Sequence, residues 1–310
     1  LFDNQEAGNY YFIDLVSTGP GPGMISFNQT HKDPVKRDIF SNKDFRIAMS
    51  HAINRQEVID TIFIGQGEPF QAALMPSSPF YDEEFAKQYT AYDPDLANEL
   101  LDSIGLEQRD EAGFRLMPNG ERLQVSVNAS VARQDWVDIT ELVKVYWDAV
   151  GVETIVNTGD RSLLAEMHLN NEHDATIWFL EGGGGLEPLI SPYLLLPDIP
   201  YMSVYGIGWA YWRLSPEDDR AVAPPDGVEN AIDLYSQVLR TVDAEERASL
   251  MTDLVDQAKE NFYGIGVNSQ PTQYGIVSND LRNVMQTMPY TFTWPTPGPS
   301  NPEHWYFVNE

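Results

Sequence analysis

The segment richest in potential binding chemistry follows an apolar strand predicted over residues 175–180. Trp178 and Phe179 lie near the end of this strand, and Glu181 and four consecutive glycines follow it. In an open α/β sheet, the loops at the carboxyl ends of the strands line the crevice that binds ligands. The first candidate ligand-binding residues are therefore Trp178, Phe179, Glu181, Gly182 and Gly183. The alternative is that Trp178 packs in the core and that the glycines form a mobile loop.

A second group of candidates is aromatic. Six residues fall within a short stretch, at Tyr193, Tyr201, Tyr205, Trp209, Tyr211 and Trp212. Aromatic faces stack on sugar rings or on peptide side chains, and fixing their two torsions costs little entropy. Residues 181–225 are rich in Gly and Pro and are predicted to be a loop, so about half of these rings should reach solvent or ligand. The further candidate ligand-binding residues are Tyr193, Trp209 and Trp212.

Residue types for other chemistries are missing or scattered. The chain has no cysteine, which excludes disulfides, thiolate metal sites and a cysteine nucleophile. Its five histidines form no metal-binding motif, and the glycine run lacks the Lys-Ser/Thr of a phosphate-binding loop. We therefore expect no metal, no cofactor and no catalytic residue. The enzyme class to weigh against a ligand-binding protein is a glycoside hydrolase. Its chemistry needs two carboxylates facing one bond, and the sequence singles out no such pair.

The charge balance argues against two classes of partner. The chain has 47 Asp and Glu against 19 Lys and Arg, a formal net charge of -28. Such a surface repels phosphate backbones and anionic lipid headgroups, so we expect no nucleic-acid partner. No stretch reaches the length of a transmembrane helix, so no direct membrane insertion is expected. The chain begins Leu-Phe-Asp-Asn without a signal peptide, which suggests a cut made by processing or by design.

The elements that would position the candidates follow from hydrophobic periodicity. Helical periodicity over residues 136–150 separates strands predicted near Val125 and Val156, and a shorter helix leads to a strand near Ile177. This alternation is typical of parallel βαβ units. The sequence therefore predicts an α/β fold over residues 24–268, with these strands adjacent in a mixed sheet flanked by helices. Further helices are predicted over 44–53, 54–65, 93–105, 228–240 and 243–261, and further strands over 24–28, 264–267 and 274–277.

Four sequence blocks, in this order, resemble a known family. The first, from Asp44-Phe45-Arg46 to Glu57-Val58-Ile59, is similar to the signature helix pair of the family 5 extracellular solute-binding proteins. The others are Gly65-Gln66-Gly67 with Pro76 downstream, the helix from Tyr92-Asp93-Pro94 to Ile104-Gly105-Leu106, and Trp147-Asp148-Ala149-Val150-Gly151-Val152. Members of this family are the dipeptide, oligopeptide, nickel and oligosaccharide receptors of ABC importers.

The resemblance implies a periplasmic binding protein-like fold, type II and cluster C-like, in which two hinged lobes close on a solute. It implies a hinge-proximal extended segment at residues 1–23 and the second lobe at 24–270. C-terminal strands and a tail at 271–310 would return to a first lobe that the chain lacks. The implied function is binding and not catalysis. The protein would be periplasmic or extracellular, with a lipid anchor at a missing N-terminus as one option, and would deliver its solute to ABC permease transmembrane subunits.

The resemblance also bears on the solute. In peptide-binding members, a Trp at the place of Trp178 is followed by an Asp that pairs with the terminal ammonium of the peptide. Here Glu181 is the nearest acid, and the glycines after it would leave backbone amides free for hydroxyl groups. With residues 209–212 as aromatic platforms, the sequence favours an oligosaccharide over an oligopeptide. We expect one exposed concave face, lined by Trp178, Glu181, residues 182–185, Trp209 and Trp212.

Overall fold

A four-stranded sheet forms the centre of the main body. The structure, a computed structural model, describes residues 1–269, 273–291, 294 and 298–308. The sheet has the order β2-β5-β3-β4, with β2 at Met24–Phe27, β5 at Ala175–Trp178, β3 at Gln124–Ser130 and β4 at Glu153–Gly159. Strand β3 pairs in parallel with β4 and β5, whereas β2 is antiparallel to β5. The prediction of an α/β fold with these strands adjacent in a mixed sheet is confirmed.

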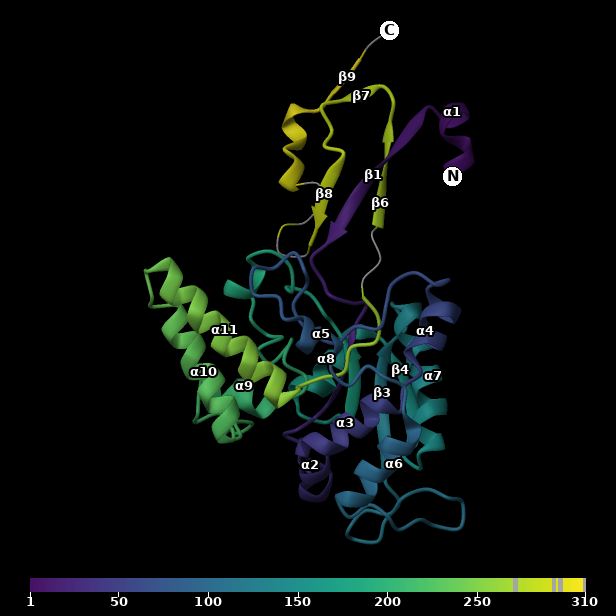
Figure 1. Ribbon diagram of the computed structural model, residues 1–310, viewed down its shortest axis with the longest axis vertical. Coiled ribbons are helices and arrows are strands. Elements are labelled where there is room, and N and C mark those ends of the chain that lie inside the picture. The colour runs from purple at the N-terminus through teal and green to yellow at the C-terminus, as the bar shows by residue number, and fades with distance from the viewer. Residues whose placement is uncertain (270–272, 292–293, 295–297, 309–310) are drawn as a thin grey trace.

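Helices surround this sheet (Figure 1). Strands β2 and β5 are buried along their whole length, as expected for strands covered on both faces. Helix α7 (Gln134–Ala149) buries a stripe at helical spacing against the sheet, with Trp136, Ile139, Val143 and Trp147 among its members. Its burial explains why residues 136–150 carry so clear a periodicity.

Most of the other helices begin at short polar side chains that accept a backbone N–H, for example Asn54 before α4 and Asp243 before α11. They are α1 (Gln5–Gly8), α2 (Pro34–Ser41), α3 (Lys43–His51), α4 (Arg55–Ile62), α5 (Glu83–Lys87), α6 (Pro94–Ser103), α8 (Arg161–Leu169), α9 (Ile207–Leu214), α10 (Asp226–Val238) and α11 (Ala244–Asn261). Short 3-10 turns are at Phe2–Asn4, Glu187–Leu189, Gly298–Ser300 and Pro302–His304. Among the described residues, none of these helices has the length and apolarity needed to cross a bilayer.

The sequence misses helices α1, α2, α5 and α9 and predicts one strand wrongly. Helix α2 starts at Asp33, which accepts two backbone N–H groups, and is followed by Pro34, so the start signal was present. Helix α9 lies inside the stretch expected to be a loop, and no side-chain hydrogen bond caps its start. Residues 264–267 form no strand, because they meet β2 only through one isolated bridge between Ile25 and Ile265.

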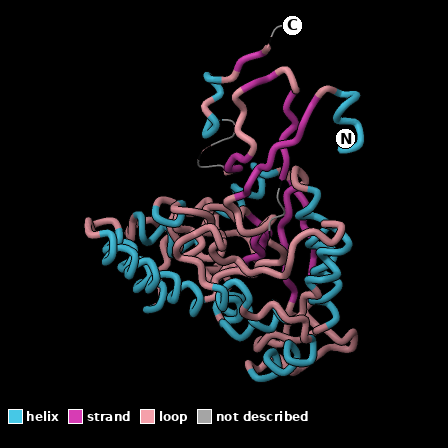
Figure 2. Tube along the Cα trace, turned by 45° about the horizontal axis from the view of Figure 1, so that its top comes forward, coloured by secondary structure: helices cyan, strands magenta, loops and turns pink. Residues whose placement is uncertain are grey.

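A second sheet, of three strands, rises from one end of the body (Figure 2). Strand β1 (Tyr10–Ser17) lies at its centre, antiparallel to β6 (Gln273–Ser278) and parallel to β8 (Thr287–Tyr290). Both chain termini lie at this end of the molecule (Figure 1), as does a small sheet of β7 (Leu281–Arg282) and β9 (Tyr306–Phe307). The lobe boundary expected between residues 270 and 271 lies outside the described residues.

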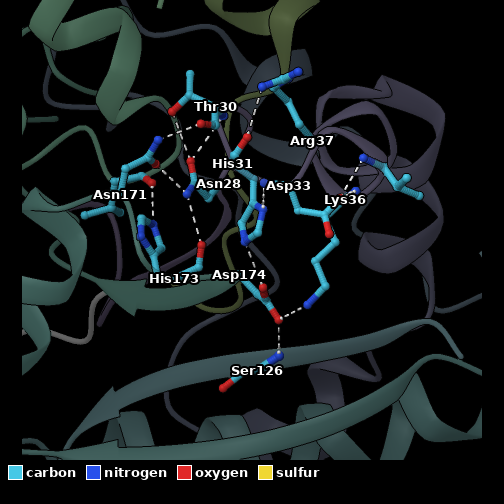
Figure 3. A network of polar contacts seen from close by, with 12 residues as sticks. Asn28, Thr30, His31, Asp33, Lys36, Arg37, Ser126, Asn171, His173 and Asp174 are labelled. Carbon is cyan, nitrogen blue, oxygen red and sulfur yellow. Dashed lines mark hydrogen bonds and ion pairs between the residues drawn. The ribbon is translucent and has the colours of Figure 1, made fainter. Parts of the chain in front are cut away.

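The partly buried carboxylate of Asp174 joins several elements of the body (Figure 3). It accepts hydrogen bonds from the Ser126 backbone N–H at 3.0 Å and from Lys36 Nζ at 2.7 Å, and His31 Nε2 lies at 3.1 Å. Burial alone would raise its pKa, but the bonds from His31, Lys36 and Ser126 outweigh burial and hold the pKa at about 2. One side chain therefore fixes the start of β5 to strand β3 and to helix α2.

Replacing Asp174 with Asn should lower the free energy of unfolding by about 2 kcal/mol at pH 7, because Lys36 loses its charged partner. A lowered carboxyl pKa contributes stability above pH 3.8 that disappears as the pH falls towards 2. The deficit of Asp174→Asn should therefore shrink in acid. Urea unfolding at several pH values measures this deficit.

Asp218→Asn is the matched control, since the pKa of Asp218 is also lowered to about 2 but its carboxylate is solvated beside Arg220. It should change stability little. Equal losses in the two variants, or a deficit for Asp174→Asn that does not depend on pH, would contradict this account of the network.

Candidate ligand-binding site

A cavity of about 370 Å³, here named the junction cavity, lies where the chain passes between the two sheets. It is lined by Gly19, Gly21 and Pro22, which belong to the segment that connects β1 to β2 (residues 18–23, here named the crossing segment). Ser17, just before this segment, also lines the cavity. Gln273 and Tyr290 contribute from β6 and β8, and the main body contributes Arg133, Phe179, Leu180 and Glu181. The cavity is therefore built from parts that are far apart in the sequence.

Glu181 is the acid on the wall of this cavity. Its backbone N–H donates to the Tyr193 hydroxyl, which fixes the main chain, while its half-buried carboxylate makes no hydrogen bond or ion pair within the described residues. The pKa of the Glu181 carboxyl is raised, chiefly by burial and further by the neighbouring charge of Glu187, while the charge of Arg133 acts to lower it. The carboxylate is thus available to a cationic or hydrogen-bonding group of a ligand.

A second cavity, of about 270 Å³ and here named the side cavity, shares Phe179 and Glu181 with the junction cavity. Its other lining residues are Arg161, Tyr201 and Met202. Two of the predicted binding residues, Phe179 and Glu181, are therefore brought together on the wall between two hollows. A third, Tyr193, is only 2% exposed and contacts Glu181 by accepting the hydrogen bond from its backbone N–H.

The glycine run packs closely and is not a free loop. Gly183 donates its N–H to the Thr18 carbonyl at 2.9 Å and accepts from the Met75 N–H at 2.8 Å. A Cβ at Gly183 would lie 2.9 Å from Pro20, and Gly182 has a φ of +75° that favours glycine. Gly182, Gly183 and Gly184 are all buried, so the glycines allow the crossing segment to approach, and the Gly183 amide is not free for ligand hydroxyls.

Three tryptophans predicted to be exposed lie elsewhere. Trp178 is fully buried, donates Nε1–H to the Tyr201 carbonyl at 2.9 Å and meets His168 edge-on at 4.7 Å. Trp209 is 5% exposed and packs in an apolar cluster with Tyr193. Trp212 is half-buried, and neither Trp209 nor Trp212 lines either cavity. The expectation that all three line an exposed face is wrong, because β5 lies inside the sheet and α9 turns its aromatic stripe inward.

The crossing segment is held by two side chains that the sequence analysis missed. The Pro22 carbonyl accepts from Trp136 Nε1 at 2.7 Å and from Arg133 Nη2 at 3.2 Å. Arg133 stacks over the Trp136 ring at 4.7 Å and pairs with Asp135 at 2.7 Å. Arg133 follows the carboxyl end of β3, next to β5, so the sheet-edge rule that selected Glu181 could also have selected it. Nothing local marks Tyr290 or Gln273, which come from distant strands.

Comparison with known proteins places the chain in a family. The family model of the bacterial extracellular solute-binding proteins, family 5 Middle, matches residues 2–194. A di/tripeptide-binding protein 1 of Pseudomonas aeruginosa is 26% identical over 163 residues, which are 53% of this chain and 27% of the relative. Because the family model covers more than half of the chain, the chain belongs to this family.

Two solved structures are similar over nearly the whole chain. An oligopeptide-binding protein OppA matches with a TM-score of 0.82 and 32% identity, over all of this chain and 50% of that one. The MelB protein from agrobacterium fabrum, in complex with stachyose, matches with a TM-score of 0.79 and 18% identity, over 97% of this chain and 45% of that one. The second likeness shows the fold alone. The chain spans about half the length of these two proteins.

Replacing Trp136 with Phe should free the crossing segment, because the Pro22 carbonyl loses a buried donor. Trp147→Phe is the matched control: Trp147 is equally buried on α7, and its Nε1–H donates to the Met49 carbonyl at 3.0 Å inside the body. Both variants should lose about 1–3 kcal/mol of unfolding free energy. In hydrogen exchange, only Trp136→Phe should speed the amides of residues 18–24. The same exchange pattern in both variants would show that Trp136 does not hold the crossing segment.

Proposed function

We propose that this chain is the solute-capturing part of the substrate-binding component of an ABC importer, acting in the periplasm or outside the cell. Membership of the extracellular solute-binding family supports this, as does the position of the junction cavity. A cavity between two connected sheets can close on a solute when the sheets move about the crossing segment. The captured solute would then pass to the transmembrane permease subunits.

The observation that carries the proposal is the carboxylate of Glu181. A half-buried acid without a partner costs free energy, and a cationic group of a solute would offset that cost. This favours a solute with an ammonium group, such as a short peptide. The names of two relatives, a di/tripeptide-binding protein and an oligopeptide-binding protein, agree with this class.

An oligosaccharide is the second candidate. The sequence favoured it because of free glycine amides and aromatic platforms at residues 209–212, and the packing of Gly183 and Trp209 removes support from both arguments. The half-exposed rings of Phe179, Tyr201 and Tyr290 still offer faces on which a sugar could stack. The fold shared with the stachyose complex keeps this candidate open to test.

Binding without catalysis is the proposed activity. A glycoside hydrolase needs two carboxylates facing the same bond. Glu187, whose charge acts on Glu181, is 1% exposed and accepts from the Thr291 hydroxyl, so it faces protein. Within the described residues, no three His, Cys, Asp or Glu side chains are grouped to hold a metal. Among the residues that line the junction and side cavities, Glu181 therefore has no second carboxylate that could face the same bond.

Calorimetry on the intact protein tests the proposal with di- to pentapeptides, their N-acetylated forms, and cello-, xylo- and galacto-oligosaccharides. Peptides with a free amine should bind, and N-acetylation or Glu181→Gln should weaken binding by about tenfold or more, the value of a hydrogen bond between charged groups. Glu229→Gln, an exposed acid on α10, should change nothing.

The pH dependence has a defined sign. Since the pKa of Glu181 is raised, its carboxylate protonates at a higher pH than an ordinary glutamate, and peptide affinity should begin to fall correspondingly early on acidification. Tight binding of an oligosaccharide that is insensitive to Glu181→Gln, with no peptide binding, would overturn the choice of peptide.

A further inference from the structure

The side chain of Arg161 is an unusual cation in this protein. Acidic residues outnumber basic ones by 47 to 19, so almost every Lys and Arg finds a partner. Among the described residues, 17 of these 19 side chains make an ion pair or a hydrogen bond to protein, and the exceptions are Arg161 and Arg240. Arg161 is therefore an exception in this protein, and its surrounding shows what it can bind.

That surrounding is a pair of cavities. Arg161, the first residue of α8, borders the side cavity and also an open hollow of about 490 Å³, here named the outer cavity. Tyr201 lines both, and Arg220 also lines the outer cavity. Arg240, by contrast, is exposed near the end of α10 and lines neither of these hollows. Both unpaired cations are exposed, but of the two only Arg161 borders these hollows.

The walls next to Arg161 are apolar and aromatic. Phe179 and Tyr201 have ring centroids 6.3 Å apart and planes inclined by 31°, and Met202 completes the side cavity. Glu181 and Glu166 line the cavities that Arg161 borders, yet neither approaches within ion-pair distance of its guanidinium. A guanidinium beside aromatic faces suits a carboxylate carried on an apolar or ring-shaped frame, since the planar fork pairs bidentately and the rings pack on the frame.

We propose that Arg161 binds a carboxylate of the solute in the side cavity, with the frame that carries this carboxylate packed against Phe179 and Tyr201. The proposal rests on the function proposed above and sharpens it. Glu181 lines both the junction cavity and the side cavity, and Arg161 also lines the side cavity, so the site presents one acid and one base to the same solute. The solute class is then one with a carboxylate, supplied either by a peptide or by a uronic acid of an oligosaccharide.

Calorimetry on the intact protein distinguishes the two sources with matched pairs of probes: trialanine against trialanine amide, and trigalacturonate against galactotriose. In at least one of these two pairs, the form with the carboxylate should bind about tenfold more tightly than its neutral partner. Arg161→Met should bring that ratio close to one by weakening the carboxylate form alone. Arg240→Met, which removes the other unpaired cation, should leave the ratio unchanged. The preference should also shrink at high salt, because the interaction is between charges.

Each other outcome overturns the inference. Equal binding of the two members of both pairs would show that no carboxylate is recognised, while the binding itself would uphold the proposed function. A uniform loss of affinity for both members in Arg161→Met would mean that the side chain only shapes the cavity. If none of the four probes binds, the inference fails, and the wider peptide and oligosaccharide panel decides the proposed function separately.

Discussion

The pairing of β1 with β6 and β8 is the constraint on which the rest of the site depends. It joins Tyr10 to Ser278 and Leu15 to Gln273, so both ends of the chain belong to one sheet while the body between them belongs to another. The chain must therefore pass between the sheets, and it does so through a segment whose glycine positions have no room for a side chain. A Cβ at Gly19 would lie 2.6 Å from the Leu180 carbonyl oxygen, and one at Gly21 would lie 2.6 Å from that of Asn268.

This narrow passage explains the chemistry of the site. The glycines after Glu181 pack against the crossing segment, and Trp136 and Arg133 donate hydrogen bonds to its Pro22 carbonyl. What remains between the sheets is a hollow whose wall carries Phe179 and Glu181. Because the protein is so acidic, most of its cations are used in ion pairs, and a guanidinium left without a partner beside a hollow becomes a distinguishing feature.

The sequence was sufficient for what depends on local periodicity and insufficient for what depends on distant pairing. Helix α7 could be predicted because its buried positions recur at helical spacing, and strands β3, β4 and β5 because short runs rich in β-branched residues alternate with helices. Phe179 and Glu181 were found from the carboxyl end of a strand. Trp209 was misplaced because an aromatic cluster among Gly and Pro gives no sign of a helix that turns inward. Tyr290 could not be found, because only the long-range pairing of β8 with β1 brings it to the cavity.

The central claim is that the solute binds between the two sheets, and fluorine NMR of the protein labelled with 5-fluorotryptophan tests it directly. The Trp136 indole packs edge-on against Phe179 at 5.3 Å and lies under Arg133, and both of these residues line the junction cavity. Adding the tightest-binding solute of the panel should shift the Trp136 signal and leave that of Trp147 unchanged. A shift confined to Trp209 or Trp212, with Trp136 unmoved, would place the solute at α9 and contradict the account.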